Sequence, residues 1–497
     1  MAQQSFLAKA RPLVLARMAT AVMSFAIPLV LARKLTLPEY GTYKQLFLAA
    51  LTLYYVIPFG VPQALYFFIP RAERTRPYFG QTIAFLSVAG ALGGILVAAA
   101  TGPLSHYFSN PELLEYRWQL GAYVAFLISA STLEPSLTTR GRTGQAAVAY
   151  LVFDGLRAVA LVVPALLGYG LPGTMTAIVF FAALRSVAAW ALVLRAKGGP
   201  LFERGRLREQ LAYAAPFGAS VLIAIPQQYA HQYAVSAMVP PALFAIYAAG
   251  CFQLPLVDLL YTPTSEVLMV QIGQLDSEGR GAEAAAAFQT AMSKLALAFL
   301  PLSAFLFATA PEFIALAFGP KFMAAVPLFR VSLVPVVLAI FPVDGLLRAR
   351  NDTRHIFRVS LAKAALTIPF VYFGVTRFGM MGGIVSFVSA EALGKALLMW
   401  RLPRALGTQG RRLGFPELLP WRALAKPAGA ALSAALAVYA VRRAGADLWA
   451  LLGPGFFQRL IPMAVLGTLF AAAYVFLLRA AGMRLSLADL GLRRRFS

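Results

Sequence analysis

Cysteine, histidine and acidic side chains are scarce in this sequence of 497 residues, which contains one cysteine, three histidines and 20 Asp and Glu residues. The single Cys251 excludes an internal disulfide and a thiolate cluster, and we expect no metal site. Charged residues make up 13% of the chain, about half the share in a soluble protein. The 39 glycines follow no triplet period, which excludes collagen, and the 60% hydrophobic content excludes a disordered chain.

Long hydrophobic runs dominate instead, and the mean hydropathy is +0.71. A helix of about 20 apolar residues crosses a hydrocarbon core of about 30 Å. The runs predict an all-α polytopic membrane protein with 14 transmembrane helices. The predicted spans are 11–32, 42–66, 79–101, 118–139, 146–168, 173–196, 211–237, 242–272, 286–309, 323–347, 356–376, 380–402, 422–441 and 457–479.

The chain carries 44 Lys and Arg and a net charge of +24. Positive charge collects in the cytoplasmic loops of membrane proteins, and no basic patch interleaved with aromatic residues indicates nucleic-acid binding. With the amino terminus inside, most of the basic loop residues face the cytoplasm, whereas Arg33 and Lys34 are an outer exception. We therefore predict a multi-pass membrane protein with both termini in the cytoplasm.

The loops are too short to form a soluble domain, since none between spans exceeds about 20 residues. No glycine-rich nucleotide-binding loop ending in Gly-Lys-Ser/Thr is present, and the outer loops hold few acids. The sequence therefore predicts that the protein is not an enzyme and binds no cofactor. Coupling to H+, Na+ or the membrane potential stays open.

Two halves of the sequence repeat with an offset of about 208 residues. Residues 137–143 align with 346–351, and 170–173 align with 379–382. The period covers six spans, an even number, so the two halves have the same membrane orientation. Parallel repeats of this kind place the substrate between the two lobes. The predicted domains are an N-terminal lobe at 1–196, a cytoplasmic linker at 197–210, a C-terminal lobe at 211–404, a cytoplasmic loop at 405–421, an accessory helix pair at 422–481 and a basic cytoplasmic tail at 482–497.

Several short motifs resemble those of a known family. They are LARKLTLPEYGTY at 31–43, IYAAG at 246–250 with Pro255, the Phe-Gly, basic, aromatic, Ala and Pro element within 314–329, RARND at 348–352 and GMMGG at 379–383. In order and spacing they resemble the polysaccharide flippase family, within the multidrug/oligosaccharidyl-lipid/polysaccharide exporter superfamily. In place of the acid that family members often carry in the seventh span, this chain has Gln227 and Gln228, followed by His231.

The resemblance implies a V-shaped pair of six-helix lobes that works by alternating access. It implies a substrate of undecaprenyl-pyrophosphate-linked oligosaccharide for polysaccharide or O-antigen biosynthesis. Membrane lipids and a polysaccharide polymerase or export machinery are the other expected partners. A cation-coupled multidrug antiporter of the same fold and a lipid II flippase remain alternatives. The glycan, the coupling ion, the oligomeric state and the role of the last two spans stay undetermined.

Ionisable residues within spans are costly and need partners or a water-filled cavity. One set on spans 5, 6, 11 and 12 is expected to form structural ion pairs, with Asp154–Arg157 at i,i+3 and Glu391–Lys395 at i,i+4. A direct substrate role for these residues is the alternative. The full set is Asp154, Arg157, Arg185, Lys363, Glu391 and Lys395.

A second set lies on the spans that line the central cavity in the resembling family. It includes Glu134, His231 and Asp344 besides the candidates below. A pyrophosphate needs cations, so Arg17, Lys44 and Arg330 are the candidate substrate-binding residues. Asp258 and Glu266 are the candidate ion-coupling residues, with an ion pair to Arg330 or Lys294 as the alternative. Prolines such as Pro255, Pro327, Pro335 and Pro342 predict bent spans.

Overall fold

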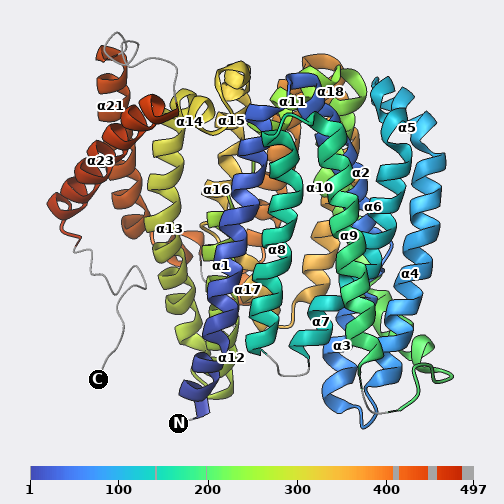
Figure 1. The fold of residues 1–497 in the computed structure, drawn as a ribbon. Coiled ribbons are helices and arrows are strands. Elements are labelled where there is room, and N and C mark those ends of the chain that lie inside the picture. The colour runs from blue at the N-terminus through green and yellow to red at the C-terminus, as the bar shows by residue number, and fades with distance from the viewer. Residues whose placement is uncertain (1, 140–142, 197–198, 407–413, 446–455, 484–497) are drawn as a thin grey trace. The chain divides into compact units, whose positions relative to one another are not determined.

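The computed structural model describes residues 2–139, 143–196, 199–406, 414–445 and 456–483, and these are helical and connected by short turns. The contacts divide the chain into two units, Met1–Ala248 and Ala249–Ser497. The helices of the first unit (Figure 1) are α1 (Ala2–Lys34), α2 (Leu37–Val56), α3 (Val61–Phe68), α4 (Arg76–Ala99), α5 (Thr101–Tyr107), α6 (Arg117–Ser129), α7 (Leu133–Thr138), α8 (Thr143–Leu166), α9 (Gly170–Leu194), α10 (Arg206–Met238) and α11 (Pro241–Gly250). Its 3-10 turns are η1 (Ile69–Arg71), η2 (Pro111–Tyr116) and η3 (Ala130–Thr132).

The second unit follows with the same kind of element. Its helices are α12 (Pro255–Ser277), α13 (Ala284–Ala308), α14 (Ala310–Ala317), α15 (Val326–Ser332), α16 (Val334–Leu338), α17 (Val343–Ala349), α18 (Thr353–Met399), α19 (Leu402–Ala405), α20 (Phe415–Leu418), α21 (Trp421–Ala444) and α23 (Phe456–Ala480). Its 3-10 turns are η4 (Gly281–Glu283) and η5 (Pro320–Ala325). Residues 484–497, most of the predicted basic tail, lie outside the described residues.

The number of spans is only partly fixed by helix length and composition. Among the described residues, nine helices are long and apolar enough to cross a membrane, and 11 spans result if α2–α3 and α11–α12 each count as one. This confirms a polytopic, all-helical membrane protein, whereas the count of 14 is not confirmed. One source of the difference is α18, which joins two predicted spans across Gly379, where φ is 59° and ψ is −146°.

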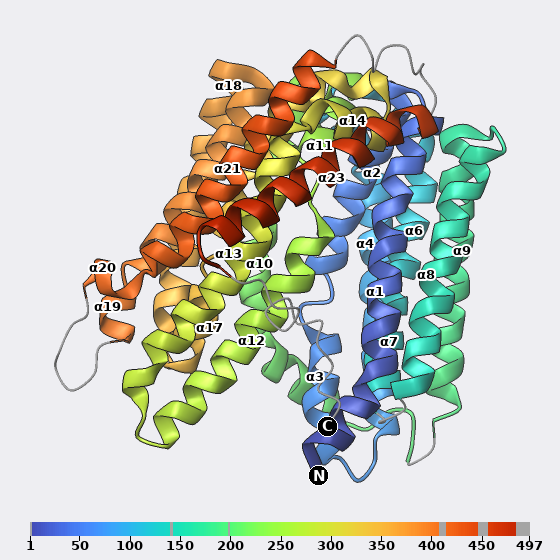
Figure 2. The same ribbon diagram turned by 90° about the vertical axis from the view of Figure 1, so that its left-hand side faces the viewer.

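Small residues allow the helices of the first unit to pack closely. A Cβ added at Gly94 of α4 would lie 2.4 Å from the carbonyl oxygen of Gly121 on α6. The backbones of α4 and α6 therefore touch, as small residues permit in membrane helices. On another side of this unit α1 packs along α8, and α8 along α9 (Figure 2).

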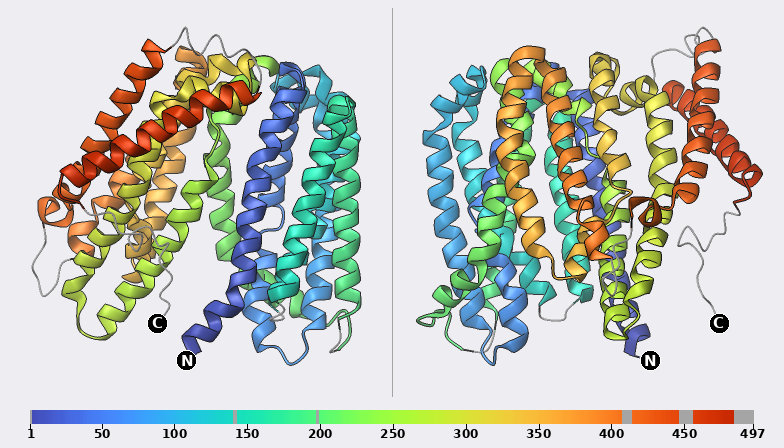
Figure 3. Two further views of the ribbon diagram at one scale, coloured as in Figure 1. Left: turned by 60° about the vertical axis from the view of Figure 1, so that its left-hand side comes forward. Right: turned by 180° about the vertical axis from the view of Figure 1, so that it is seen from behind.

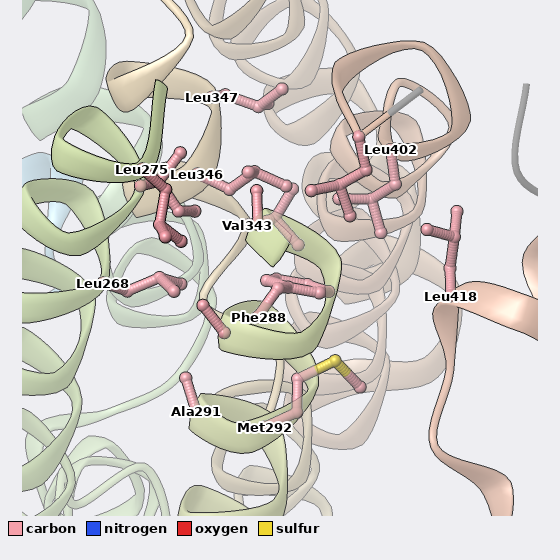
Figure 4. Close-up of a cluster of buried hydrophobic side chains, with 14 of the residues drawn as sticks. Leu268, Leu275, Phe288, Ala291, Met292, Val343, Leu346, Leu347, Leu402 and Leu418 are labelled. Carbon is pink, nitrogen blue, oxygen red and sulfur yellow. The ribbon is translucent and has the colours of Figure 1, made fainter. Parts of the chain in front are cut away.

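The second unit is held together by two apolar clusters. One joins α12, α13, α17 and α19, with Phe288 of α13 packed beside Val343 and Leu346 of α17 (Figure 4). The other joins α13 to α21 and α23 through Ala430, Ala431, Ala434, Ala435 and Phe470. Figure 3 shows the ribbons of α21 and α23, in red, at one edge of the second unit. The last two helices therefore pack against α13 of the second unit.

Several helices break where the sequence contains proline or glycine. Pro335 lies in the first turn of α16, and Pro342 lies in the break at 339–342, with φ of −80° and ψ of 54°. Pro255 and Pro327 lie at the first turns of α12 and α15. The predicted bends therefore coincide with helix starts or breaks, because proline cannot donate the backbone hydrogen bond of a continuous helix.

The sequence repeat has structural counterparts. Gly170 and Gly379, which the repeat aligns, both have positive φ, 57° and 59°. The 3-10 turn η3 interrupts the predicted fourth span just before Glu134, and the break at 339–342 interrupts the tenth just before Asp344. The helix α10 and most of α11 belong to the first unit. The lobe boundaries at 196 and 211 stay a prediction.

Candidate functional site

Charged side chains from three helices meet in the interior of the first unit. Arg185 of α9 forms an ion pair with Glu134 of α7 at 2.5 Å. Arg157 of α8 lies 3.4 Å from Asp154, one turn earlier on that helix, and donates to Ser24 Oγ of α1 at 2.7 Å. Glu134, Asp154 and Arg185 line a common pocket. The structure thus brings together three of the predicted structural charges and Glu134, which the sequence assigned to the cavity set.

The corresponding charges of the second unit form a different set of contacts. Lys363 and Glu391, both on α18, are 2.9 Å apart on either side of the Gly379 break. Gly394 permits this pairing, because a Cβ there would lie 2.7 Å from Lys363 Cδ. The expected i,i+4 pair of Glu391 with Lys395 is wrong. The Lys395 ammonium donates instead to the Phe341 carbonyl at 2.8 Å and to the Tyr261 hydroxyl at 3.4 Å.

Asp344 is the centre of the second polar cluster. Its carboxylate accepts hydrogen bonds from the Tyr261 hydroxyl, from Ser265 Oγ at 3.1 Å and from Arg348 Nη2 at 2.9 Å. Gly345 allows this approach, because a Cβ there would lie 2.5 Å from the carbonyl oxygen of Ser265 on α12. A carboxylate with three donors is well stabilised inside a membrane protein.

The motif RARND at 348–352 links the ends of several helices in the second unit. Arg350 lies 3.1 Å from Asp276 at the end of α12. Asp352 lies 2.6 Å from Arg401, which follows α18. Together with the Arg348–Asp344 pair, the charges of this motif have structural partners and bind α12, α17 and α18 together.

Two of the three predicted substrate-binding cations are described, and neither has an acidic partner among the described residues. Lys44 of α2 is half-buried, with its ammonium 5.6 Å from the centre of the Tyr40 ring. Arg330 of α15 lies 5.2 Å from the Phe307 ring and donates to the Phe307 carbonyl at 3.2 Å. Arg17 lies on α1, and its side chain is outside the described part of the structure. An aromatic ring offsets less charge than a carboxylate does, so Lys44 and Arg330 can still bind an anion.

The two predicted ion-coupling acids lie on α12 and are exposed. Neither Asp258 nor Glu266 forms an ion pair with Arg330, Lys294 or any other described residue. His231 of α10 is buried, and its Nδ1 lies 2.7 Å from the Tyr247 hydroxyl, which is a structural hydrogen bond.

Sequence reasoning missed the uncharged members of these clusters. Tyr261 and Ser265 lie on the face of α12 that meets Asp344, and their spacing of four residues is the only signal for this. A buried network was also missed, in which Gln45 donates to Ser236 at 2.9 Å and accepts from Asn110 at 2.6 Å. Polar side chains within apolar spans, such as Gln45 beside Lys44, could have indicated it.

Comparison with known proteins identifies relatives of this chain. The family model described as a polysaccharide biosynthesis protein matches residues 30–327. No curated protein matches the sequence. Among solved structures the chain is similar to the lipid II flippase MurJ in an inward closed conformation, with a TM-score of 0.73 and 11% identity over 94% of this chain and 99% of that chain. It is also similar to an inward-facing multidrug resistance MATE family transporter of the MOP superfamily, with a TM-score of 0.62 and 15% identity over 79% of this chain and 98% of that chain.

Proposed function

Because the chain belongs to the polysaccharide biosynthesis protein family, we propose that it is a flippase that moves a lipid-linked oligosaccharide across the bacterial plasma membrane. The family match carries this proposal. The family consists of membrane transporters and not of enzymes, and the fold is that of the MOP superfamily. The finer statement, that the substrate is an undecaprenyl-pyrophosphate-linked glycan moved by alternating access, is our inference from the resemblance and the charges.

The proposed architecture has 14 spans in two parallel lobes, 1–196 and 211–404, forming a V, with an accessory pair at 422–481. Several observations support this number. The 11 spans obtained by counting bent pairs become 12 when α18 is divided at Gly379. The helices α1 and α10, each 33 residues long, supply the remaining two. With an even number of spans, both termini lie in the cytoplasm, as the basic loops indicate.

The substrate's pyrophosphate would bind Arg17, Lys44 and Arg330. A pyrophosphate must leave water without entering hydrocarbon unpaired, and fixed cations offset the cost. The support is that Lys44 and Arg330 contact aromatic rings and no described carboxylate, so their charges are available. Asp258 and Glu266 remain candidates for binding a coupling ion, because neither has a described ionic partner.

Two alternatives concern the substrate. The similarity to MurJ favours a lipid II flippase, and the similarity to the MATE transporter favours a multidrug antiporter. Both likenesses are at low identity and concern the fold. The family match is independent of them and favours a polysaccharide precursor.

Reconstitution distinguishes the three. Three sets of proteoliposomes are prepared. One set carries an undecaprenyl-pyrophosphate oligosaccharide in one leaflet, and a second carries lipid II in one leaflet. The third contains a cationic dye in the lumen. A glycan-cleaving enzyme that cannot cross the membrane reports each glycan reaching the opposite face. We expect the oligosaccharide to become accessible at least tenfold faster than in protein-free vesicles. Movement of lipid II alone or of dye alone would replace the proposal with the corresponding alternative.

A further inference from the structure

Each unit contains a tyrosine, an acid and a cation that the sequence repeat relates. Tyr54, Glu134 and Arg185 of the first unit precede Tyr261, Asp344 and Lys395 of the second by about 207 to 210 positions, close to the repeat period. In both units the acid directly follows a break in its span, at η3 and at 339–342. The two triads can therefore be compared as copies of one arrangement.

In the first unit the acid and the cation touch directly. Arg185 lies 2.5 Å from Glu134, and Tyr54 lies near both charges without separating them. An arginine guanidinium stays protonated in proteins. The cation of this copy therefore has no proton to release.

In the second unit the tyrosine lies between the two charges. Lys395 donates to the Tyr261 hydroxyl at 3.4 Å, and that hydroxyl in turn donates to Asp344. Lys395 also donates to the Phe341 carbonyl at 2.8 Å. The same carbonyl accepts from Val343 N at 2.9 Å across Pro342, which makes a tight turn in the helix break. The Lys395 ammonium thus donates to a carbonyl that also takes part in the tight turn of the break.

We propose that Lys395, Tyr261 and Asp344 form a proton-binding site whose occupancy controls the bend at 339–342. Lysine, unlike arginine, can lose its proton in a protein interior. While Lys395 is protonated, the Phe341 carbonyl is fixed. Without the proton the neutral amine donates weakly, and the bend is free to open or straighten. The site would bind H+ as the coupling ion of the transport proposed above, as the alternative to Asp258 and Glu266, and its role in coupling rests on that proposed function.

The proton transfer balances without another reactant. Lys395 Nζ passes a proton to the Tyr261 oxygen while the Tyr261 hydroxyl proton moves to Asp344 Oδ1. The products are a neutral amine, an unchanged tyrosine and a neutral carboxylic acid. The contacts run from Lys395 through Tyr261 to Asp344 and Arg348. The side chains of Asp344 and Arg348 are 30% and 42% exposed, so protons would enter and leave at these two residues.

Other charged groups surround the site and act on its protonation. Arg348 of α17 donates to the Asp344 carboxylate. Besides Asp344, the charged groups near Lys395 are Glu391 and Lys363 of α18, which have opposite signs. Glu391 and Lys363 also form an ion pair with each other.

Hydrogen exchange of the backbone tests the site without any substrate. The measured quantity is the protection factor of the backbone amides of residues 339–341, 343 and 344, corrected for the intrinsic pH dependence of exchange. We expect it to fall at least tenfold as pH rises in the wild type and to stay high at every pH in Lys395→Arg. The turn at 130–134 is an internal control, because Arg185 neighbours it and cannot titrate. A pH-independent wild type, or a Lys395→Arg variant that matches the wild type, would overturn the proposal.

A second measurement uses the reconstituted protein and separates this proposal from the transport function. A pH dye inside the vesicles reports proton movement when the oligosaccharide lipid is added. We expect Tyr261→Phe and Lys395→Met to lower proton movement at least tenfold, and Lys294→Met and Tyr372→Phe, matched changes outside the site, to leave it unaltered. Wild-type glycan transport without proton movement would overturn the coupling site alone. Absence of transport in the wild type, with the exchange result intact, would overturn only the proposed substrate.

Discussion

Arg185 on α9 and Glu134 on α7 form an ion pair of 2.5 Å that joins the sixth predicted span to the fourth. The Arg185 side chain is 12% exposed and that of Glu134 is 39% exposed. An ion removed from water is stable only while its partner remains, so the pair fixes the position of α7 after the η3 break. The Arg185–Glu134 pair therefore has a structural role.

Removal of one member of this pair is expected to destabilise the protein. Breaking a buried pair costs about 3–5 kcal/mol, and the partial exposure of Glu134 reduces this to about 1–2 kcal/mol. We expect Arg185→Met to lower the thermal unfolding temperature in detergent, and Arg185→Met with Glu134→Leu to recover most of it. Arg208→Met, an exposed arginine, is the control. An unchanged melting temperature in Arg185→Met would show that the pair contributes nothing.

Asp154 is expected to be less sensitive than Glu134. Its distance of 3.4 Å from Arg157 is longer, and Arg157 keeps its hydrogen bond to Ser24 when Asp154 is lost. Asp154→Ala should therefore lower expression and melting temperature less than Glu134→Ala does. Normal protein levels in Asp154→Ala with transport abolished would instead assign Asp154 to the substrate path.

Gly345 of α17 and Gly273 of α12 differ in the room that a side chain would have, so they give a matched pair of substitutions. A Cβ at Gly345 would lie 2.5 Å from the Ser265 carbonyl, so Gly345→Ala must push α17 away from α12, at about 1–3 kcal/mol. A Cβ at Gly273 of α12 meets nothing within 4 Å, and Gly273→Ala should stabilise the helix by about 0.5–1 kcal/mol. Thermal unfolding of both variants measures the difference. Equal melting temperatures would contradict the close approach.

The helical membrane class and most span positions were predictable, because long apolar runs have one stable form in lipid. The repeat was also visible in sequence, and the positive φ of Gly170 and Gly379 agrees with it. The partners of the charges were less predictable. Glu391 has Lys395 four residues away on its own helix, yet it pairs with Lys363 across the Gly379 break. The break changes which side chains meet, and residue spacing alone assumes a continuous helix.

The sequence could not predict that Tyr261 lies between Lys395 and Asp344. A tyrosine in an apolar span is consistent with simple packing, and only the close approach of α17 at Gly345 brings its hydroxyl to the carboxylate. Whether Lys44 and Arg330 have acidic partners likewise depends on side-chain packing. Composition gives the excess of cations and does not say which of them are paired.

The loop before α13 gives a pH-dependent local contact. Glu283 accepts from Arg280 Nε at 2.7 Å, and this hydrogen bond lowers the pKa of Glu283. A lowered pKa means that the contact is complete above the ordinary pKa of a glutamate and is lost as pH falls through the value in the folded protein. Limited proteolysis of 278–286 should be faster in Arg280→Gln than in the wild type at neutral pH. The two rates should converge in acid, and a constant difference at all pH would contradict the contact.

The last prediction concerns Lys44 and Arg330, the two described cations assigned to the pyrophosphate. Aromatic contacts hold both side chains, so their removal leaves no buried carboxylate unpaired, and the protein should still fold. Arg330→Ala should lower glycan surface display at least tenfold at matched protein level. Arg330→Lys should lose less, because it keeps the charge and loses only the planar pair of donors. Arg377→Ala, a cation held over Phe373 outside the proposed site, is the control for a general effect of lost charge. We also expect Lys44→Ala to lower glycan surface display more than Lys44→Arg does. Arg17→Ala alone should lower it as well. Full surface display in cells carrying Arg17→Ala and Arg330→Ala together would show that these cations do not bind the pyrophosphate.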